Sequence, residues 1–245
     1  MTFSIGSLPH GDLIPGTDAQ VSEDAHDRGN SHQAGQEAHT QGALGDQGAN
    51  LVGKENLQKY ADQFQITQPV KFDGITTARG NFDLSKAAKV QIAWGGIGQY
   101  TDQINPCAFL TFTGAIANGG KYYLPSLVES TIQNGQETKY NIGYPTKAFT
   151  QETAQKLKNA LSLVIKDGTG TLAQPQTVSA GGKTATAQTG KNQNGRELIS
   201  SWFCGFFPLE DPKYVVIIFS EDTTKQTKSC AEIFSIIADK ITELP

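Results

Sequence analysis

The feature that most constrains the fold is a series of three strand-like runs between Ser179 and Asp222. The second run, Ser201–Phe207, and the third, Tyr214–Phe219, are rich in aromatic and β-branched residues, which favour strands. Leu209–Pro212 lies between them and has the composition of a tight turn. The first run carries Lys183 behind two glycines. The sequence therefore predicts an antiparallel meander with Lys183 on its first strand.

The first strand of this meander carries side chains that suit an anion. Because successive side chains alternate between faces, we expect Lys183 and Ala185 on one face and Thr184 and Thr186 on the other. Gly181-Gly182 has no Cβ, so a ligand could approach the backbone closely. A cation, hydroxyls and free N–H groups would suit a carboxylate or an oxyanion. The alternative is a solvated lysine that discourages edge-to-edge aggregation.

Composition narrows the functional classes. The formal net charge is -4, which gives no indication of a nucleic-acid partner. Cys107, Cys204 and Cys230 show no metal or redox spacing, and we expect Cys204 and Cys230 to be buried thiols. The sequence contains neither a run of about 18 apolar residues nor a basic segment followed by an apolar core. We therefore expect no transmembrane segment and no signal peptide. We also expect no cofactor.

Residues 1–50 differ in composition from the rest of the chain. They contain all four histidines, no lysine and a single aromatic residue, Phe3. Such a segment buries too little apolar surface to offset its ordering entropy, so we expect disorder there. The histidine spacing matches no compact metal-ligand pattern, and we expect no metal site. The predicted domains are a low-order segment, 1–50, and a globular part, 51–245.

Apolar periodicity and capping residues predict four helices in the globular part. Leu57, Tyr60, Ala61 and Phe64 mark the first. The other three begin at the capping residues Asn105, Thr150 and Ser229, the last within an S-x-x-E capping box. Between the helices we expect a loop over Lys71–Ser85, a glycine-rich turn over Ala93–Gln99 and an extended segment over Lys121–Val128.

Several segments, in their order and spacing, resemble the C-terminal part of the transpeptidase domain of class B penicillin-binding proteins. The resemblance covers roughly Leu51 to the C-terminus. It implies an α/β (α+β) fold of the β-lactamase and transpeptidase type, and acyl transfer through a serine ester in peptidoglycan cross-linking. The segments that carry it are Trp94–Gln99, Ala115–Gly120, Asp167–Gly170, Gly182–Gln188 and Ser201–Phe207.

The family's K-T-G motif maps onto Lys183, Thr184 and Ala185. The resemblance implies that Lys183 assists electrostatically, that Thr184 and Thr186 anchor the carboxylate of a peptidoglycan stem peptide or β-lactam, and that the Thr186 N–H is an oxyanion donor. This sequence departs from the motif at Ala185, where the family usually has glycine. We expect the methyl group of Ala185 to reduce the space in the cleft modestly without inactivating the site.

The family's other two motifs, S-x-x-K and S-x-N, are absent from this sequence. No serine has a lysine three residues later, and the first lysine is Lys54. Counting back from Gly53–Leu57, the S-x-N motif should fall at Thr40–Gly42, which contains neither serine nor asparagine. Without the nucleophile and its base, no acyl-enzyme is expected.

These departures favour a transpeptidase-domain fragment that is inactive alone. We hypothesise that residues before about Asn50 come from a shifted reading frame or a mis-called start. The expected sheet is antiparallel, incomplete and flanked by helices, and it leaves Tyr214–Phe219 as an exposed apolar edge. By resemblance the family acts at the outer face of the bacterial plasma membrane, held by an N-terminal helix that this sequence does not show.

The alternatives belong to other functional classes. The chain could be a non-catalytic binding module. Its Lys183 strand would then bind either peptidoglycan peptides or a cell-wall synthesis protein of the division machinery. It could also be a non-functional gene fragment. Covalent labelling by a penicillin would distinguish the transpeptidase from both alternatives.

Overall fold

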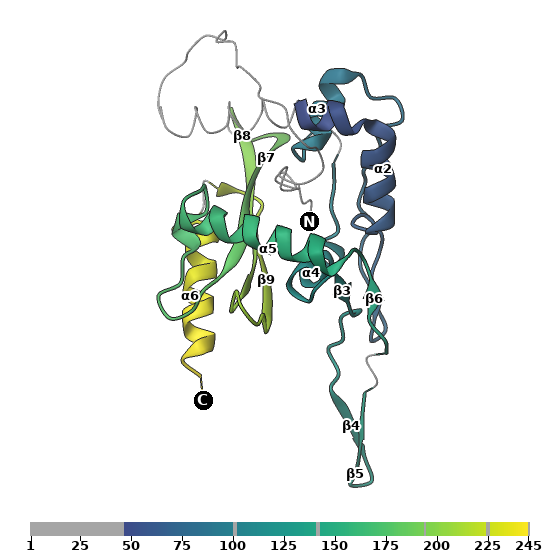
Figure 1. The fold of residues 1–245 in the computed structure, drawn as a ribbon, viewed down its shortest axis with the longest axis vertical. Helices are drawn as coiled ribbons and strands as arrows, with labels where there is room; N and C mark the ends of the chain where they lie inside the picture. Colours follow the sequence, from purple (N-terminus) through teal and green to yellow (C-terminus); the bar gives the residue numbers. More distant parts are fainter. Residues whose placement is uncertain (1–46, 100–101, 141–142, 194, 224–225, 245) are drawn as a thin grey trace.

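The fold is built on the predicted meander. The computed structural model describes residues 47–99, 102–140, 143–193, 195–223 and 226–244. Strands β7 (Gly181–Gln193), β8 (Arg196–Phe207) and β9 (Tyr214–Ser220) form an antiparallel sheet in the order β7-β8-β9 (Figure 1). Gly195 has a φ of 75° at the β7–β8 turn, a conformation that favours glycine. The predicted three-stranded meander is therefore confirmed.

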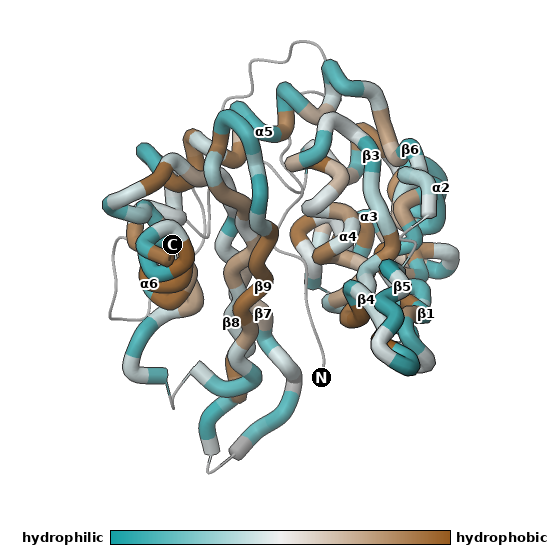
Figure 2. The backbone as a smooth tube through the Cα atoms, turned by 90° about the horizontal axis from the view of Figure 1, so that it is seen from below, coloured by the Kyte–Doolittle hydropathy of each residue, from teal (hydrophilic) through white to brown (hydrophobic). Residues whose placement is uncertain are grey.

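Helices cover both faces of this sheet. Helix α6 (Cys230–Thr242) lies on one face, where the Phe203 and Phe234 ring centroids are 4.7 Å apart. Helix α4 (Pro106–Ala117) lies on the other face (Figure 2). There the ring centroids of Phe109 and Trp202 are 4.7 Å apart. Burial on both faces explains why β8 reads as an almost continuous apolar run. The mixed helix-and-sheet fold that was expected is confirmed.

The helices begin at the predicted capping residues. The Asn105 side chain accepts hydrogen bonds from the backbone N–H groups of Cys107 and Ala108 at the start of α4. Thr150 accepts from the Thr153 N–H at the start of α5 (Gln151–Lys166), which packs beside β7. At α6 both halves of the Ser229–Glu232 capping box are formed. Capping thus fixes where three of the helices start.

Helix α2 (Lys54–Gln63) matches the first predicted helix, but the glycine-rich turn over Ala93–Gln99 is partly wrong. Residues 93–96 belong to helix α3 (Lys89–Gly96), and the chain turns only at residues 97–98. A Cβ on Gly95 would lie 2.8 Å from Leu84 Cδ2. This glycine therefore permits close packing of α3 against Leu84 instead of forming a turn.

Short hairpins occupy two regions where none was predicted. The expected loop over Lys71–Ser85 contains β1 (Lys71–Phe72) and β2 (Ile75–Thr76), because Asp73 and Gly74 both have positive φ and close a two-residue turn. Strands β4 (Ser130–Gln133) and β5 (Gln136–Lys139) form an arm that projects from the body (Figure 1). Asn134-Gly135 closes the arm, and this dipeptide is the hairpin signal that the sequence contained.

The remaining elements are a short strand pair at the base of this arm and a 3₁₀ turn beside α6. Strands β3 (Lys121–Tyr122) and β6 (Thr146–Lys147) pair antiparallel where the arm joins the body (Figure 1). A 3₁₀ turn, η1 (Thr171–Ala173), follows α5 and contacts α6. The expected extended segment over Lys121–Val128 is thus a strand for its first two residues only.

At the last strand the described structure agrees only partly with the expectation. Within the described residues β9 pairs with β8 alone, so it lies at one edge of the sheet. Its side chains are half-buried apart from the exposed Tyr214, so the apolar surface at this edge is smaller than expected. Cys204 and Cys230 are buried free thiols, as predicted.

Of residues 1–50, only those from 47 onward are described. Residues 47–52 are helical, and Ala49 is buried in a cluster with Leu84 and Ile92. Residues 47–50 are thus ordered where disorder was expected, whereas residues 1–46, which include the four histidines, lie outside the described residues. The division of the chain at residue 50 therefore stays a prediction.

Candidate functional site

Strand β7 places the candidate residues on the faces that alternation predicts. Ala185 pairs with Trp202 and is buried in the cluster on the α4 side of the sheet. Thr184 pairs with Phe203, which belongs to the cluster on the α6 side. Lys183 and Ala185 therefore share one face of the strand, and Thr184 lies on the opposite face.

Lys183 is half-buried, and its ammonium group contacts the next residue on the strand. Its Nζ donates to the Thr184 carbonyl oxygen at 2.9 Å and to the Thr184 hydroxyl at 3.3 Å. Burial lowers the pKa of Lys183 below its ordinary value, because desolvation penalises the charged form. These contacts differ from the freely solvated edge lysine that was the alternative interpretation.

A second hydroxyl joins this group from outside the strand. The hydroxyls of Thr184 and Thr169 are 3.0 Å apart. Thr169 lies in the Asp167–Gly170 segment that follows α5, so the turn at the end of this helix is held against β7. An ammonium group and two hydroxyls therefore lie in one hydrogen-bonded chain, a set of groups that can bind a carboxylate.

The backbone near Thr186 is directed to the outer edge of the sheet. The Gln99 side chain donates to the Thr186 carbonyl at 3.3 Å, whereas the neighbouring Ala187 carbonyl accepts from Ser200 of β8 at 3.4 Å. In an antiparallel strand the N–H and C=O of one residue point the same way. The Thr186 N–H is therefore also directed away from β8, as an oxyanion donor would require.

The glycines that precede Lys183 serve internal packing instead of the close ligand approach that was expected. A Cβ on Gly182 would lie 2.5 Å from Phe203 Cζ, and one on Gly181 would lie 2.8 Å from Phe206 Cζ. The aromatic rings of β8 fill the space that the missing Cβ atoms leave.

The Ala185 methyl group is also part of the core. It is buried in the cluster that contains Phe109 and Trp202. The methyl group is thus accommodated by the core on the α4 side of the sheet, and the structure gives no sign that it narrows the outer edge of β7.

The described residues supply no partner that could activate a nucleophile beside Lys183. Within these ranges its ammonium group forms hydrogen bonds only with Thr184. The segment expected at the S-x-N position, Thr40–Gly42, lies outside the described residues. Across the described part of the chain, no group of three or more His, Cys, Asp or Glu side chains could hold a metal ion.

Sequence reasoning missed the partners of the candidate residues. Gln99 contacts β7 across 87 residues of chain, and Thr169 contacts Thr184 across 15. Both belong to segments that carry the family resemblance, Trp94–Gln99 and Asp167–Gly170. That resemblance was the only signal that could have indicated their proximity.

Known proteins are similar to this chain over most of its length. The family model of the penicillin binding protein transpeptidase domain matches residues 44–240. Stage V sporulation protein D of Bacillus subtilis (strain 168) is 30% identical over 174 residues, which are 68% of this chain and 26% of that protein. The peptidoglycan D,D-transpeptidase MrdA of Acinetobacter baumannii is 25% identical over 200 residues, which are 71% of this chain and 29% of that protein.

Solved structures show the same fold. The D,D-transpeptidase domain of a peptidoglycan glycosyltransferase from Eggerthella lenta superposes with a TM-score of 0.68 at 25% identity, covering 82% of this chain and 51% of that one. Penicillin binding protein 3 from Mycobacterium tuberculosis, complexed with aztreonam, gives 0.70 at 21% identity, covering 82% of this chain and 49% of that one. The alignments with the two curated relatives span less than a third of those proteins' own length.

Proposed function

Since this chain belongs to the penicillin binding protein transpeptidase domain family, we propose that β7 is one wall of its substrate cleft. In this proposal Lys183, Thr184 and Thr186 hold the carboxylate of a peptidoglycan stem peptide or of a β-lactam. The observation that carries it is the chain of contacts that joins Lys183, Thr184 and Thr169. By family, the site would act at the outer face of the plasma membrane. None of the helices in the described ranges has the length and apolar character to cross a membrane.

The chemistry of the wall favours an anion over a neutral group. The half-buried ammonium of Lys183 donates only to neutral oxygens among the described residues, so a carboxylate would give it a charge-assisted hydrogen bond. Such a bond stabilises a complex by about 1.5–3 kcal/mol. The bound anion would also raise the lowered pKa of Lys183 toward its ordinary value, because an opposite charge favours the ammonium form.

The second part of the proposal is that this chain alone binds without acylation. Acyl transfer needs a nucleophile and a base, and no serine of this sequence has a lysine three residues later. The remaining donors can polarise a carbonyl group but cannot form the serine ester. The chain would therefore bind reversibly where a complete transpeptidase reacts.

The test is equilibrium binding of a peptide that ends in D-Ala-D-Ala, measured by calorimetry. We expect Lys183→Ala to weaken binding by about tenfold to a hundredfold, in line with a lost charge-assisted bond. The matched control is Lys213→Ala, because Lys213 is exposed and pairs with Asp211 beyond the end of β8. Equal affinity in the original protein and the Lys183 variant would refute the assignment of the wall.

A further inference from the structure

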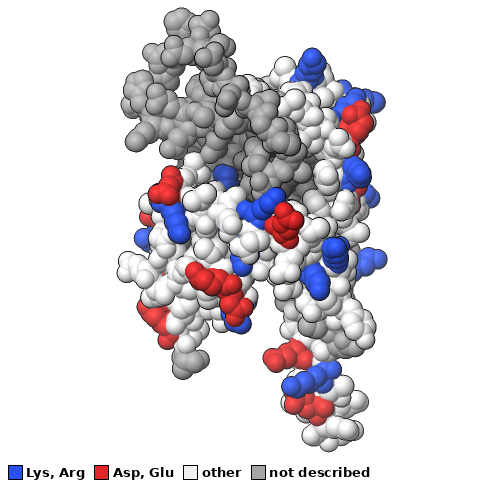
Figure 3. Space-filling view, in the orientation of Figure 1, with Lys and Arg blue, Asp and Glu red and all other residues white. Residues whose placement is uncertain are grey.

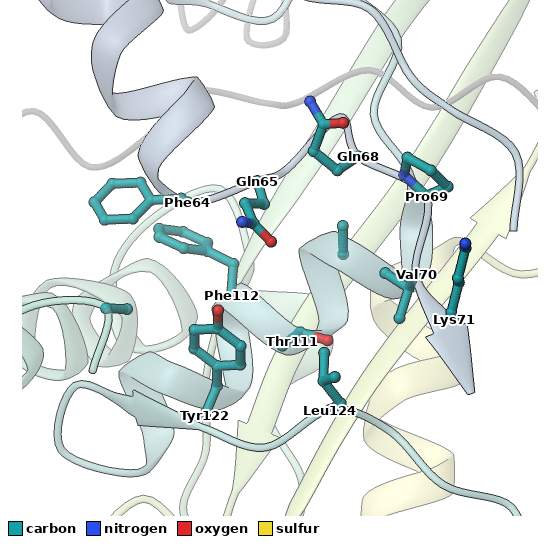
Figure 4. Close-up of a pocket in the computed structure, with 12 residues that line it drawn as sticks. Phe64, Gln65, Gln68, Pro69, Val70, Lys71, Thr111, Phe112, Tyr122 and Leu124 are labelled. Atoms are coloured by element: carbon teal, nitrogen blue, oxygen red, sulfur yellow. The ribbon is translucent and has the colours of Figure 1, made fainter. Parts of the chain in front are cut away.

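A second concave site lies on the far side of α4 from the sheet. It has a volume of about 260 Å³ and is bounded by α4, the segment after α2, β1 and β3 (Figure 4). Its apolar lining comes mainly from Phe64, Val70, Phe112 and Leu124. Helix α4 separates the site from β7, since the Phe109 ring on the same helix packs on Trp202.

Three polar side chains line this pocket without internal partners. Gln65 and Gln68 come from the segment after α2, and Tyr122 comes from β3 (Figure 4). None of their side-chain polar atoms forms a hydrogen bond with the described protein, whereas the Thr111 hydroxyl beside them donates to the Cys107 carbonyl. Two free carboxamides and a phenol beside an apolar surface are the few polar groups that a binding pocket needs to orient a ligand.

The backbone at Gln65 is strained. Gln65 has a φ of 53° and follows the C-cap of α2, where glycine or asparagine is the usual residue. A residue with a Cβ is unfavourable in the left-handed region, because the Cβ comes too close to the following carbonyl oxygen. Residues in sparsely populated backbone conformations cluster at ligand sites, so the Gln65 conformation adds to the argument for a binding site here.

The charge at the pocket has one sign. Lys71 is the only charged residue of the lining, and it forms no ion pair within the described ranges. Lys and Arg side chains also gather on the face over β3 and β6, with few acidic side chains between them (Figure 3). A ligand of this pocket should therefore carry a negative charge beside its apolar part.

We propose that this pocket binds an extended peptide segment of a partner protein. One bulky apolar side chain enters between Phe112 and Leu124. The peptide backbone pairs with the carboxamides of Gln65 and Gln68, which can each donate and accept. The following acidic residue lies beside Lys71. The volume is below the range of about 300–1,000 Å³ typical of drug-sized ligands, and it suits a single large side chain.

The test is fluorescence anisotropy of the full chain with a fluorescein-labelled hexapeptide that has a central leucine followed by two glutamates. We expect saturable binding, which replacing the leucine by serine, or the glutamates by lysines, abolishes. The peptide that ends in D-Ala-D-Ala should not compete, because α4 separates the two sites. Lys183→Ala should leave hexapeptide binding unchanged. The two binding assays therefore test the Lys183 site and the second pocket independently, and a negative result at one site can be told from a negative result at the other.

Two variants with matched controls locate the binding. Gln65→Gly should weaken binding about fivefold through lost hydrogen bonds while leaving the unfolding midpoint equal or higher, because it relieves strain. Asn134→Gly makes the same kind of change in the arm, where φ is 54°, and should not affect binding. Lys71→Glu should weaken binding about tenfold, and Lys139→Glu on β5 should not.

Several results would overturn the proposal. Absence of saturable binding would do so. Equal binding of the leucine and serine peptides, or equal affinities in the Gln65→Gly variant and the original protein, would also do so. Binding to vesicles of anionic phospholipid together with no binding of the hexapeptide would assign the surface to a membrane instead of a peptide.

Discussion

Asp102 provides a quantitative test of the packing around the start of α4. It is only 5% exposed, and neither carboxyl oxygen has a hydrogen-bond partner among the described residues. Burial raises the pKa of Asp102 from 3.8 to about 8. The folded protein therefore keeps a proton that the unfolded chain releases. The change Asp102→Asn preserves the shape of the side chain and removes this titration.

The size of the change in the free energy of unfolding follows from the pKa values of Asp102 in the unfolded and folded states. Between about pH 3.8 and about pH 8 the unfolded state binds fewer protons than the folded state, so the stability of the original protein falls as pH rises. The contribution of Asp102 is fully present below the unfolded pKa and is lost as pH rises through the folded pKa. At about 1.4 kcal/mol per pKa unit, the full loss amounts to roughly 5–6 kcal/mol.

The assay is urea unfolding of the original protein and the Asp102→Asn variant at about pH 5 and about pH 8. We expect the variant to be several kcal/mol more stable than the original protein at the higher pH, with a smaller difference at the lower pH. Titrations of other groups are common to both proteins and cancel in the comparison. Glu137→Gln on the exposed strand β5 is the control and should not change the slope. Parallel pH profiles for the original protein and the Asp102→Asn variant would refute a buried, proton-binding carboxyl.

The remaining predictions concern the core and a helix start. Phe203→Ala should destabilise the protein by about 3–5 kcal/mol, measured by urea unfolding, because Phe203 is fully buried against Phe234. A loss below about 1 kcal/mol would contradict this packing. Asn105→Ala should cost about 3 kcal/mol by the same assay, because Asn105 caps α4 and also donates to the Gln68 and Ala78 carbonyls. An unchanged midpoint would show that these bonds do not form in solution.

The sequence predicts features whose cause is local. Strands β8 and β9 follow from aromatic and β-branched runs, and the starts of α4, α5 and α6 follow from capping residues. The burial of Cys204 follows from its place in an apolar run. Each of these depends on a few neighbouring residues, so one sequence is enough to predict them.

Features that depend on distant contacts were not predictable. Gly95 of α3 indicated a turn and Gly181-Gly182 indicated ligand approach, but these glycines leave room for Leu84, Phe206 and Phe203. The burial of Asp102 gives no sequence signal, because its neighbours are polar. The β1–β2 hairpin is a local feature that was also not predicted, because strands of two residues are too short for periodicity to show.

The candidate site likewise has features that the sequence predicts and features that it does not. Alternation predicted which faces of β7 carry Lys183 and Thr184, but not that Thr169 would join them. The second pocket gathers residues from four separate segments, including Gln65, Phe112 and Tyr122, and no pattern along the chain connects them.

The central claim is that the chain keeps the Lys183 wall of a penicillin-binding cleft without a group that can be acylated. The most direct measurement is intact-protein mass spectrometry after incubation with benzylpenicillin. We predict an unchanged protein mass, with reversible binding that Lys183→Ala weakens. A mass increase of one penicillin molecule would contradict the account, because it would show that a nucleophile of this chain attacks the β-lactam ring.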